Sequence, residues 1–109
     1  MDTLQELTSI LTNFRDERDW GKFHNPKDLA LAINIETSEL LELFLWKDMQ
    51  DVDIENVELE LADIFAYLLL FSDKCQINLK NALIKKIEIN KIKYPIEKSK
   101  GVSTKYDQL

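Results

Sequence analysis

Cysteine, glycine and proline are scarce in this sequence, and each scarcity narrows the kind of protein it encodes. Cys75 is the only cysteine in 109 residues, which excludes a fold held by intramolecular disulfides. Two glycines and two prolines favour helices joined by few turns. The longest apolar run, residues 64–71, is far shorter than the roughly 20 residues needed to cross a bilayer. With no signal-peptide pattern at its start, the chain is expected to be cytoplasmic and free of membrane.

Basic residues are also in short supply, with 14 Lys and Arg against 20 Asp and Glu and a net charge of −6. Proteins that bind nucleic-acid polymers need a dense basic surface, so we expect no such partner. The charge is uneven, because residues 1–79 carry −11 and residues 80–109 carry +5. An acidic centre followed by a basic segment is therefore expected.

Helix start and stop signals predict an all-α fold of four helices in a single domain over residues 1–109. Thr3 and Glu6 have the spacing of a capping box, and Asn25, Asp53 and Asn78 are suitable N-caps. The predicted helices span about residues 3–19, 26–47, 54–74 and 79–93, followed by an irregular basic tail over 96–109. The second and third helices are apolar on more than one side, so we infer that an oligomer completes the bundle.

Two pairs of carboxylates lie on otherwise apolar arcs of the second and third helices. Glu36 and Glu39 form one pair, and Glu60 and Asp63 form the other. Residues three apart are neighbours on a helix, so each pair can bind one ion. A divalent cation would offset the repulsion of four facing carboxylates, and an all-oxygen ligand set selects Mg²⁺ or Mn²⁺.

These acids are open to other interpretations. A single such pair is common on a solvated helix, whereas two pairs on apolar arcs favour a metal. A di-iron bundle would need Glu-x-x-His motifs, and His24 is the only histidine. Because Mg²⁺ held by few carboxylates completes its shell with water and substrate phosphates, the site favours phosphoryl chemistry.

Four segments together resemble the MazG-like all-α nucleoside triphosphate pyrophosphohydrolases, most closely the dCTP pyrophosphatase branch. They are residues 14–26 (FRDERDWGKFHNP), 35–46 (IETSELLELFLW), 60–67 (ELADIFAY) and 86–95 (KIEINKIKYP). The resemblance covers nearly the whole chain. It implies an enzyme that hydrolyses a nucleoside triphosphate between its α and β phosphates, releasing a monophosphate and pyrophosphate. The implied role is to clear surplus or non-standard nucleotides from the pool.

The resemblance also implies roles for particular residues. Glu36, Glu39, Glu60 and Asp63 would bind Mg²⁺, with Mn²⁺ as a substitute, and would be the catalytic residues. The substrate-binding residues would be Trp20, Trp46 and Tyr67 around base and sugar, and Lys86 and Asn90 at the triphosphate. A homo-oligomer is implied, with a tetramer built as a dimer of dimers as the expected form, in which a neighbouring subunit completes each base pocket.

Some residues favour a structural role, and two depart from the family pattern. Arg15 and Arg18 could reach an anion, but surface ion pairs with Asp16 or Asp19 are the simpler expectation. His24 is expected to be structural, and Glu42 is expected to face away from the arc that holds Glu36. Ile35 stands where relatives commonly have Gly. Leu11 stands where some dCTP-preferring relatives carry a polar residue, which weakens the case for cytosine. Two alternatives stay open: the same chemistry on dUTP or another nucleotide, and a non-catalytic acidic helical binding module.

Overall fold

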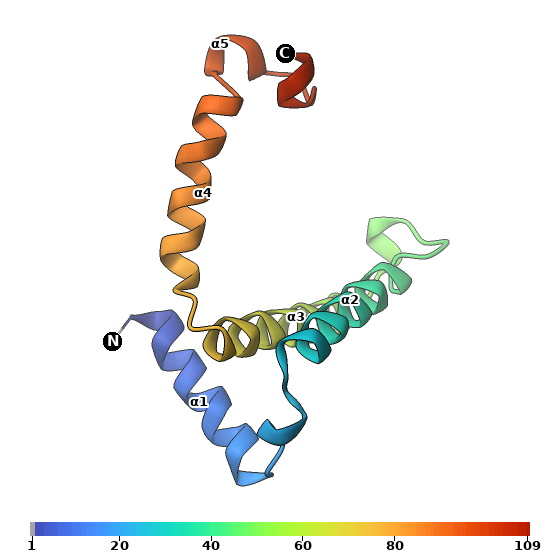
Figure 1. The fold of residues 1–109 in the computed structure, drawn as a ribbon. Coiled ribbons are helices and arrows are strands. Elements are labelled where there is room, and N and C mark those ends of the chain that lie inside the picture. Colours follow the sequence, from blue (N-terminus) through green and yellow to red (C-terminus); the bar gives the residue numbers. More distant parts are fainter. Residues whose placement is uncertain (1) are drawn as a thin grey trace. The chain divides into compact units, whose positions relative to one another are not determined.

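The computed structural model describes residues 2–109, which are all-helical and contain no strand (Figure 1). The prediction of an all-α fold is confirmed. The helices are α1 (Thr3–Glu17), α2 (Pro26–Glu42), α3 (Ile54–Lys74), α4 (Leu79–Lys93) and α5 (Ile96–Ser99). Three short 3-10 helices accompany them: η1 (Gly21–Phe23), η2 (Met49–Asp51) and η3 (Tyr106–Gln108). None of the described helices is long and apolar enough to span a membrane.

The chain forms two compact units, one ending at Ile77 and one over Asn78–Leu109. The first contains α1, α2 and α3, and the second contains α4, α5 and η3. Whether residues 1–109 behave as a single domain stays a prediction.

Side-chain caps set the helix starts. The Asn25 side chain accepts a hydrogen bond from the Asp28 amide at 2.8 Å, and Pro26 occupies the first helical position. Asp53 and Asn78 cap α3 and α4 in the same way. The capping box of α1 lies one residue earlier than predicted. The box is formed by Asp2 and Gln5, and the side chain of each accepts a hydrogen bond from the backbone amide of the other at 2.8 Å.

The second helix is shorter than predicted, since α2 ends at Glu42 rather than near Lys47. The backbone then tightens: the Phe44 amide donates to the Leu41 carbonyl at 3.0 Å, three residues back. Trp46 follows with a φ of 62°, in the left-handed region that stops a helix. Apolar periodicity continues through Leu45 and cannot reveal this change of backbone.

The tail is more ordered than predicted. Pro95 accepts backbone hydrogen bonds from Lys98 and Ser99 at 3.0 Å each, which starts the short helix α5. Farther on, the Tyr106 ring packs edge-on against Tyr94, with 6.1 Å between the ring centroids. These contacts hold the end of the chain against α4 within the second unit.

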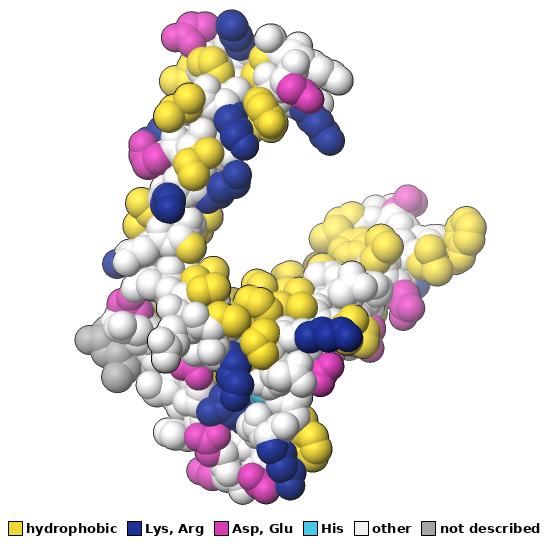
Figure 2. Space-filling view, viewed as in Figure 1, with side chains coloured by type: hydrophobic (Ala, Val, Ile, Leu, Met, Phe, Trp, Pro, Cys, Tyr) yellow, Lys and Arg dark blue, Asp and Glu magenta, His cyan; other side chains and the backbone are white. Residues whose placement is uncertain are grey.

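The core of the first unit lies where α2 and α1 pack on α3 (Figure 1). Leu29 on α2 is 1% exposed, and Leu69 and Leu70 on α3 are also buried. Hydrophobic side chains nevertheless reach the surface of both units, as Figure 2 shows. On α2 and α3 the larger exposed ones are Leu31, Ile35, Leu41, Ile54, Leu59, Leu61, Phe65 and Leu68.

Candidate functional site

Three of the four predicted carboxylates converge where α2 packs against α3. One carboxylate oxygen from each of Glu36, Glu60 and Asp63 lies within 4.8 Å of the others. Glu39 follows Glu36 by three residues on α2 and adds its negative charge beside it. The side-by-side packing of two helices thus produces the cluster that the apolar arcs predicted. We call these four residues the acidic cluster.

Two carboxylate oxygens of the acidic cluster are buried and receive no hydrogen bond from the described residues. These oxygens are Oε2 of Glu36 and Oε2 of Glu60. Burial, followed by the nearby Glu60 and Glu39 carboxyls, raises the pKa of Glu36 to about 7. A protonated Glu36 can donate a hydrogen bond to its neighbours, whereas the ionised cluster contains no donor. Buried anionic oxygens without a donor fit the needs of a cation with oxygen ligands.

A pocket of about 350 Å³ opens beside the acidic cluster, a size typical of small-molecule sites. Its wall combines two carboxylates with aromatic, apolar and basic side chains from α1, α2, α3 and the segment between α1 and α2. The lining residues are Leu11, Phe14, Arg15, Trp20, His24, Glu36, Asp63, Ala66, Tyr67 and Leu70. Phe14 and Trp20 pack edge to face, with 5.7 Å between ring centroids and 77° between ring planes.

The pocket has opposite electrostatic character toward its two ends. Burial and then the negative charges of Glu36, Asp63 and Glu39 raise the pKa of Tyr67. Burial and then the positive charges of Arg15 and Lys74 lower the pKa of His24. Tyr67 therefore lies in the field of the acidic cluster, whereas His24 lies in the field of two cations.

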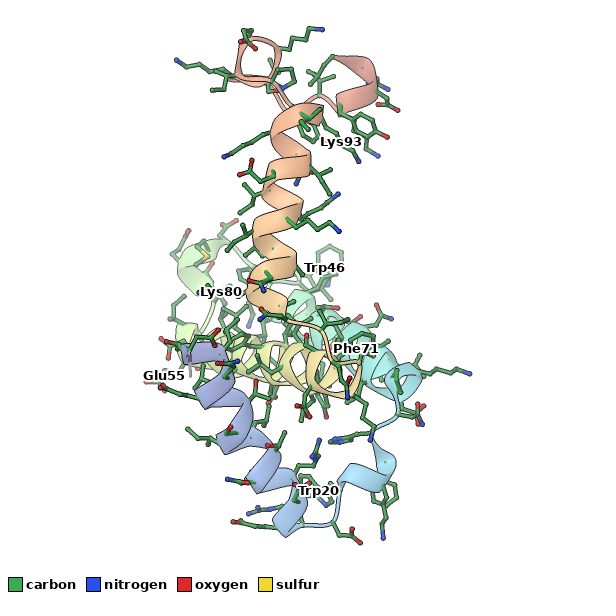
Figure 3. The ribbon with its side chains drawn as sticks, turned by 60° about the vertical axis from the view of Figure 1, so that its left-hand side comes forward. Trp20, Trp46, Glu55, Phe71, Lys80 and Lys93 are labelled. Atoms are coloured by element: carbon green, nitrogen blue, oxygen red, sulfur yellow. The ribbon has the colours of Figure 1, made fainter. Side chains whose placement is uncertain are left out.

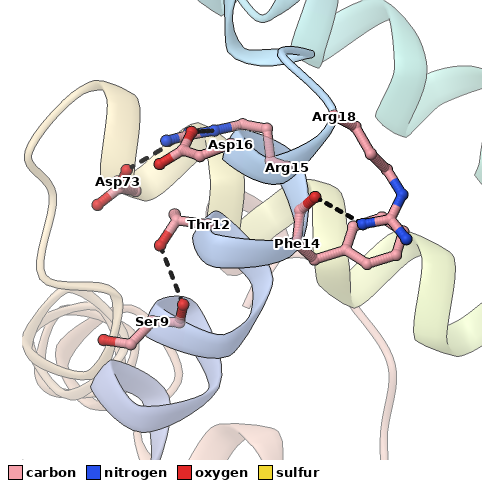
Figure 4. A network of polar contacts seen from close by, with 7 residues as sticks. All are labelled: Ser9, Thr12, Phe14, Arg15, Asp16, Arg18 and Asp73. Carbon is pink, nitrogen blue, oxygen red and sulfur yellow. Dashed lines mark hydrogen bonds and ion pairs between the residues drawn. The ribbon is translucent and has the colours of Figure 1, made fainter.

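Arg15 is held at the basic end by a network of polar contacts (Figure 4). Its Nε lies 2.9 Å from Asp16 Oδ1, and its Nη1 lies 3.9 Å from Asp73 Oδ2 on α3. The expected pair with Asp16 is present, but the Arg15 side chain is only 15% exposed and lines the pocket. Its interpretation as a surface residue was wrong, because α1 packs this face on α3. Arg18 forms a surface ion pair as expected, although its partner is Glu17 at 3.7 Å, and also lies over the Phe14 ring, 3.8 Å from its centroid.

The structure separates the two predicted tryptophans. Trp20, 45% exposed, precedes α2 and lines the pocket together with Tyr67. Trp46 follows α2 at its other end and is 95% exposed (Figure 3). Trp46 therefore does not line this pocket within the chain, and its binding role stays a prediction.

The remaining predicted ligand residues belong to the second unit. Lys86 and Asn90 lie one turn apart on α4, so both can face one anion. Glu42, predicted to turn away from the carboxylates, is exposed at the end of α2.

Sequence patterns missed His24 as a pocket residue, as they missed Arg15. The Nδ1 atom of His24 is buried and has no hydrogen-bond partner among residues 2–109. His24 lies outside the α-helices, between η1 and α2, where no helical periodicity predicts which way a side chain points. A histidine directly before a capped helix start was the one available signal.

Comparisons with known proteins agree with the geometry. Residues 31–109 match the MazG-like family. The chain is 35% identical to dCTP pyrophosphatase 1 of Rattus norvegicus and 33% identical to that of Homo sapiens, covering 98% of this chain and 68% of each relative. A pyrophosphatase of Archaeoglobus fulgidus, solved by crystallography, is 43% identical with a TM-score of 0.78, over 87% of this chain and 94% of that one.

The chain therefore belongs to the MazG-like family, which confirms the resemblance seen in its sequence.

Proposed function

We propose that this protein hydrolyses dCTP, or a related deoxynucleoside triphosphate, to the monophosphate and pyrophosphate with Mg²⁺ as its cofactor. Its class is settled by the comparisons: the chain is a nucleotide pyrophosphohydrolase enzyme. The observation that supports the metal and the substrate is the acidic cluster, with two unpartnered buried oxygens, beside a pocket large enough for a nucleoside.

The residues of the acidic cluster suit a hard divalent cation. Glu36, Glu39, Glu60 and Asp63 offer only oxygen ligands, which favour Mg²⁺ and allow Mn²⁺ to substitute. When bound, such an ion polarises phosphoryl oxygens and lowers the pKa of a water molecule. These four carboxylates are also the proposed catalytic residues, since a carboxylate beside the metal can orient the attacking water.

Other side chains bind and orient the substrate in this proposal. Trp20 and Tyr67 enclose the nucleoside, since both already line the pocket and Tyr67 lies one turn beyond Asp63 on α3. Lys86 and Asn90 hold the triphosphate, because an ammonium and an amide spaced by one turn can both donate to one anion.

We also propose that the active form is a homo-oligomer, a tetramer built as a dimer of dimers. Leu41 on α2 is 68% exposed, and other large hydrophobic side chains of α2 and α3 are also uncovered. A single chain of this size rarely leaves so much apolar surface open without a partner. The exposed Trp46 would then complete the pocket of a neighbouring subunit. A role in clearing surplus nucleotides would place the enzyme in the cytoplasm.

Replacing Glu39 with Gln tests the metal chemistry. The change keeps the shape and removes one negative charge from the acidic cluster. We expect Mg²⁺-dependent release of pyrophosphate from dCTP to fall by about 100-fold or more, since even supporting residues of metal sites change activity roughly 10- to 100-fold. Glu42→Gln, the same change on the same helix but outside the acidic cluster, should retain activity.

Full activity in Glu39→Gln would show that the proposed mechanism is wrong. A panel of deoxynucleoside and nucleoside triphosphates, assayed by pyrophosphate release with and without Mg²⁺, identifies the substrate. Preferential hydrolysis of dUTP or another nucleotide would keep the chemistry and replace dCTP as the substrate.

A further inference from the structure

Two polar side chains of the pocket are not used by the proposed chemistry. Arg15 comes from α1 and His24 from the segment before α2, and both line the pocket that contains Glu36 and Asp63. Leu11, the neighbour of Arg15 on α1, is apolar and offers a ligand no hydrogen bond from its side chain. Besides the indole N–H of Trp20 and the hydroxyl of Tyr67, which the proposal assigns to enclosing the nucleoside, Arg15 and His24 are the polar side chains that this part of the pocket offers to a base.

The basic end is separated from the acidic cluster along α3. Arg15 pairs with Asp73, which lies ten residues beyond Asp63 on the same helix. At about 1.5 Å per residue, those two positions are roughly 15 Å apart along the helix axis. A nucleotide whose phosphates meet the acidic cluster through a metal would direct its base toward Arg15 and His24.

Arg15 is positioned firmly enough to recognise a ligand. Its ion pairs to Asp16 and Asp73 engage Nε and Nη1, and neither of them engages Nη2. Gly21 lies beside it, since a Cβ at that residue would be 3.4 Å from the Arg15 Nε, at the edge of ordinary van der Waals contact. A guanidinium paired on two sides is restricted in orientation at the pocket wall, can only donate, and cannot accept a hydrogen bond.

His24 supplies a complementary group. Its buried Nδ1 has no partner among the described residues, so a ligand atom can take that place. Burial and the positive charges of Arg15 and Lys74 lower the pKa of His24 and keep the ring neutral near pH 7. A neutral imidazole has one nitrogen that accepts a hydrogen bond.

We propose that Arg15 and His24 read the polar edge of the base and make this pocket selective for cytosine over uracil and thymine. Cytosine presents a carbonyl oxygen and a ring nitrogen that both accept, next to an amino group that donates. Arg15 donates to the two acceptors, and His24 accepts from the amino group. Uracil and thymine carry an N–H at the ring nitrogen, which would face an arginine that can only donate. This inference rests on the proposed nucleotide hydrolysis.

The test compares dCTP with dUTP in the wild-type protein and in Arg15→Gln. We expect wild-type kcat/KM to favour dCTP by at least about tenfold. Arg15→Gln should lower kcat/KM for dCTP by roughly 10- to 100-fold, mainly through KM, as expected for losing hydrogen bonds from a charged group. Its kcat/KM for dUTP should change much less, so that the preference shrinks.

Arg18→Gln is the matched control, because Arg18 is the only other arginine and does not line the pocket. It should leave the preference for dCTP unchanged. Equal losses on dCTP and dUTP in Arg15→Gln, or an equal change of preference in Arg18→Gln, would overturn the proposal. Either result would leave the proposed hydrolysis intact, whereas a wild-type protein inactive on every triphosphate would refute that hydrolysis itself.

Two further measurements test the proposal in case Arg15→Gln does not fold. Asp73→Asn removes one ion pair of Arg15 and keeps the guanidinium, so it should reduce the preference for dCTP, but less than Arg15→Gln does. Calorimetry on the wild-type protein with non-hydrolysable dCTP and dUTP needs no variant. Equal affinities for the two would contradict base recognition by Arg15 and His24.

Discussion

Glu36 links the two parts of the site at the scale of single residues. It contributes an oxygen to the acidic cluster and also lines the pocket, so in the proposed mechanism this one side chain would contact both the metal and the substrate. Burial and the neighbouring negative charges both disfavour the ionised form of the Glu36 carboxyl, and a bound cation would offset them. Glu36 should therefore couple the stability of the fold to pH and to metal.

The metal-free protein should lose stability as the pH rises from about 4.5 to about 7. The pKa of Glu36 is raised in the folded protein to about 7 from an ordinary value of 4.5, so the folded state binds more protons in this interval. Stability falls with rising pH wherever the folded state binds more protons than the unfolded chain. Thermal unfolding measured in a chelator across this range would reveal the decrease.

Glu36→Gln is the control for this dependence. It cannot ionise at this position, so its stability should vary less over the same pH range than that of the wild-type protein. Adding Mg²⁺ at pH 7 or above should stabilise the wild-type protein, because ligands that bind only the folded state favour it, and should stabilise Glu36→Gln less. Parallel pH profiles for the two proteins would contradict the assignment.

Residue-level prediction from sequence was most successful where helical geometry fixes the side chains. The three-residue spacings and the apolar arcs predicted that Glu36, Glu60 and Asp63 lie close together, and the structure confirms this. Arg15 and His24 escaped prediction for different reasons. The partner of Arg15 on α3 is distant in sequence, and His24 belongs to a connection without periodicity.

At the scale of elements, the site depends on how α2 packs on α3. Leu29 on α2 is the most deeply buried side chain among those described, and it lies two turns before Glu36 on the same helix. Loss of packing at Leu29 would loosen the helix that positions half of the acidic cluster.

Leu29→Ala should destabilise the fold by about 2–5 kcal/mol, the range for large-to-small changes in a core. Leu29→Met, which nearly keeps the volume, should cost less than about 1.5 kcal/mol. Chemical denaturation of both variants measures the difference. Equal effects of the two changes would show that Leu29 does not fill a tightly packed site.

Helix starts were easier to predict than helix ends. Asn25, Asp53 and Asn78 cap the helices that their positions indicated, because a cap is a local hydrogen bond between a side chain and a nearby amide. After α2 ends at Glu42 the backbone tightens, and Trp46 then takes a left-handed conformation that its residue type does not favour. Residue propensities therefore do not predict this change of backbone.

At the scale of the whole molecule, the uncovered apolar surface is the dominant feature. Exposed hydrophobic side chains occur on α2 and α3 in the first unit and on α4 in the second. The sequence predicted that the second and third helices need cover on more than one side and that an oligomer supplies it, but it could not say how many chains take part. An assembly of identical chains is the proposed answer.

Sedimentation velocity should show a homo-oligomer, with a tetramer expected. Leu41→Glu places a charge on an exposed apolar position of α2 and should shift the distribution toward smaller species without unfolding the chain. Glu42→Gln, the adjacent change at a polar position, should leave the assembly intact. A monomeric wild-type protein would refute the proposed oligomer.

The contrasting exposure of the two tryptophans gives the protein a pair of intrinsic optical probes. Trp20 lines the pocket, and Trp46 lies open to solvent in the single chain. Emission from Trp20 should respond when a nucleotide enters, whereas emission from Trp46 should shift toward shorter wavelengths when a neighbouring subunit covers it. Two single-tryptophan variants, one keeping Trp20 and one keeping Trp46, would thus report substrate binding and subunit association separately, without an added dye.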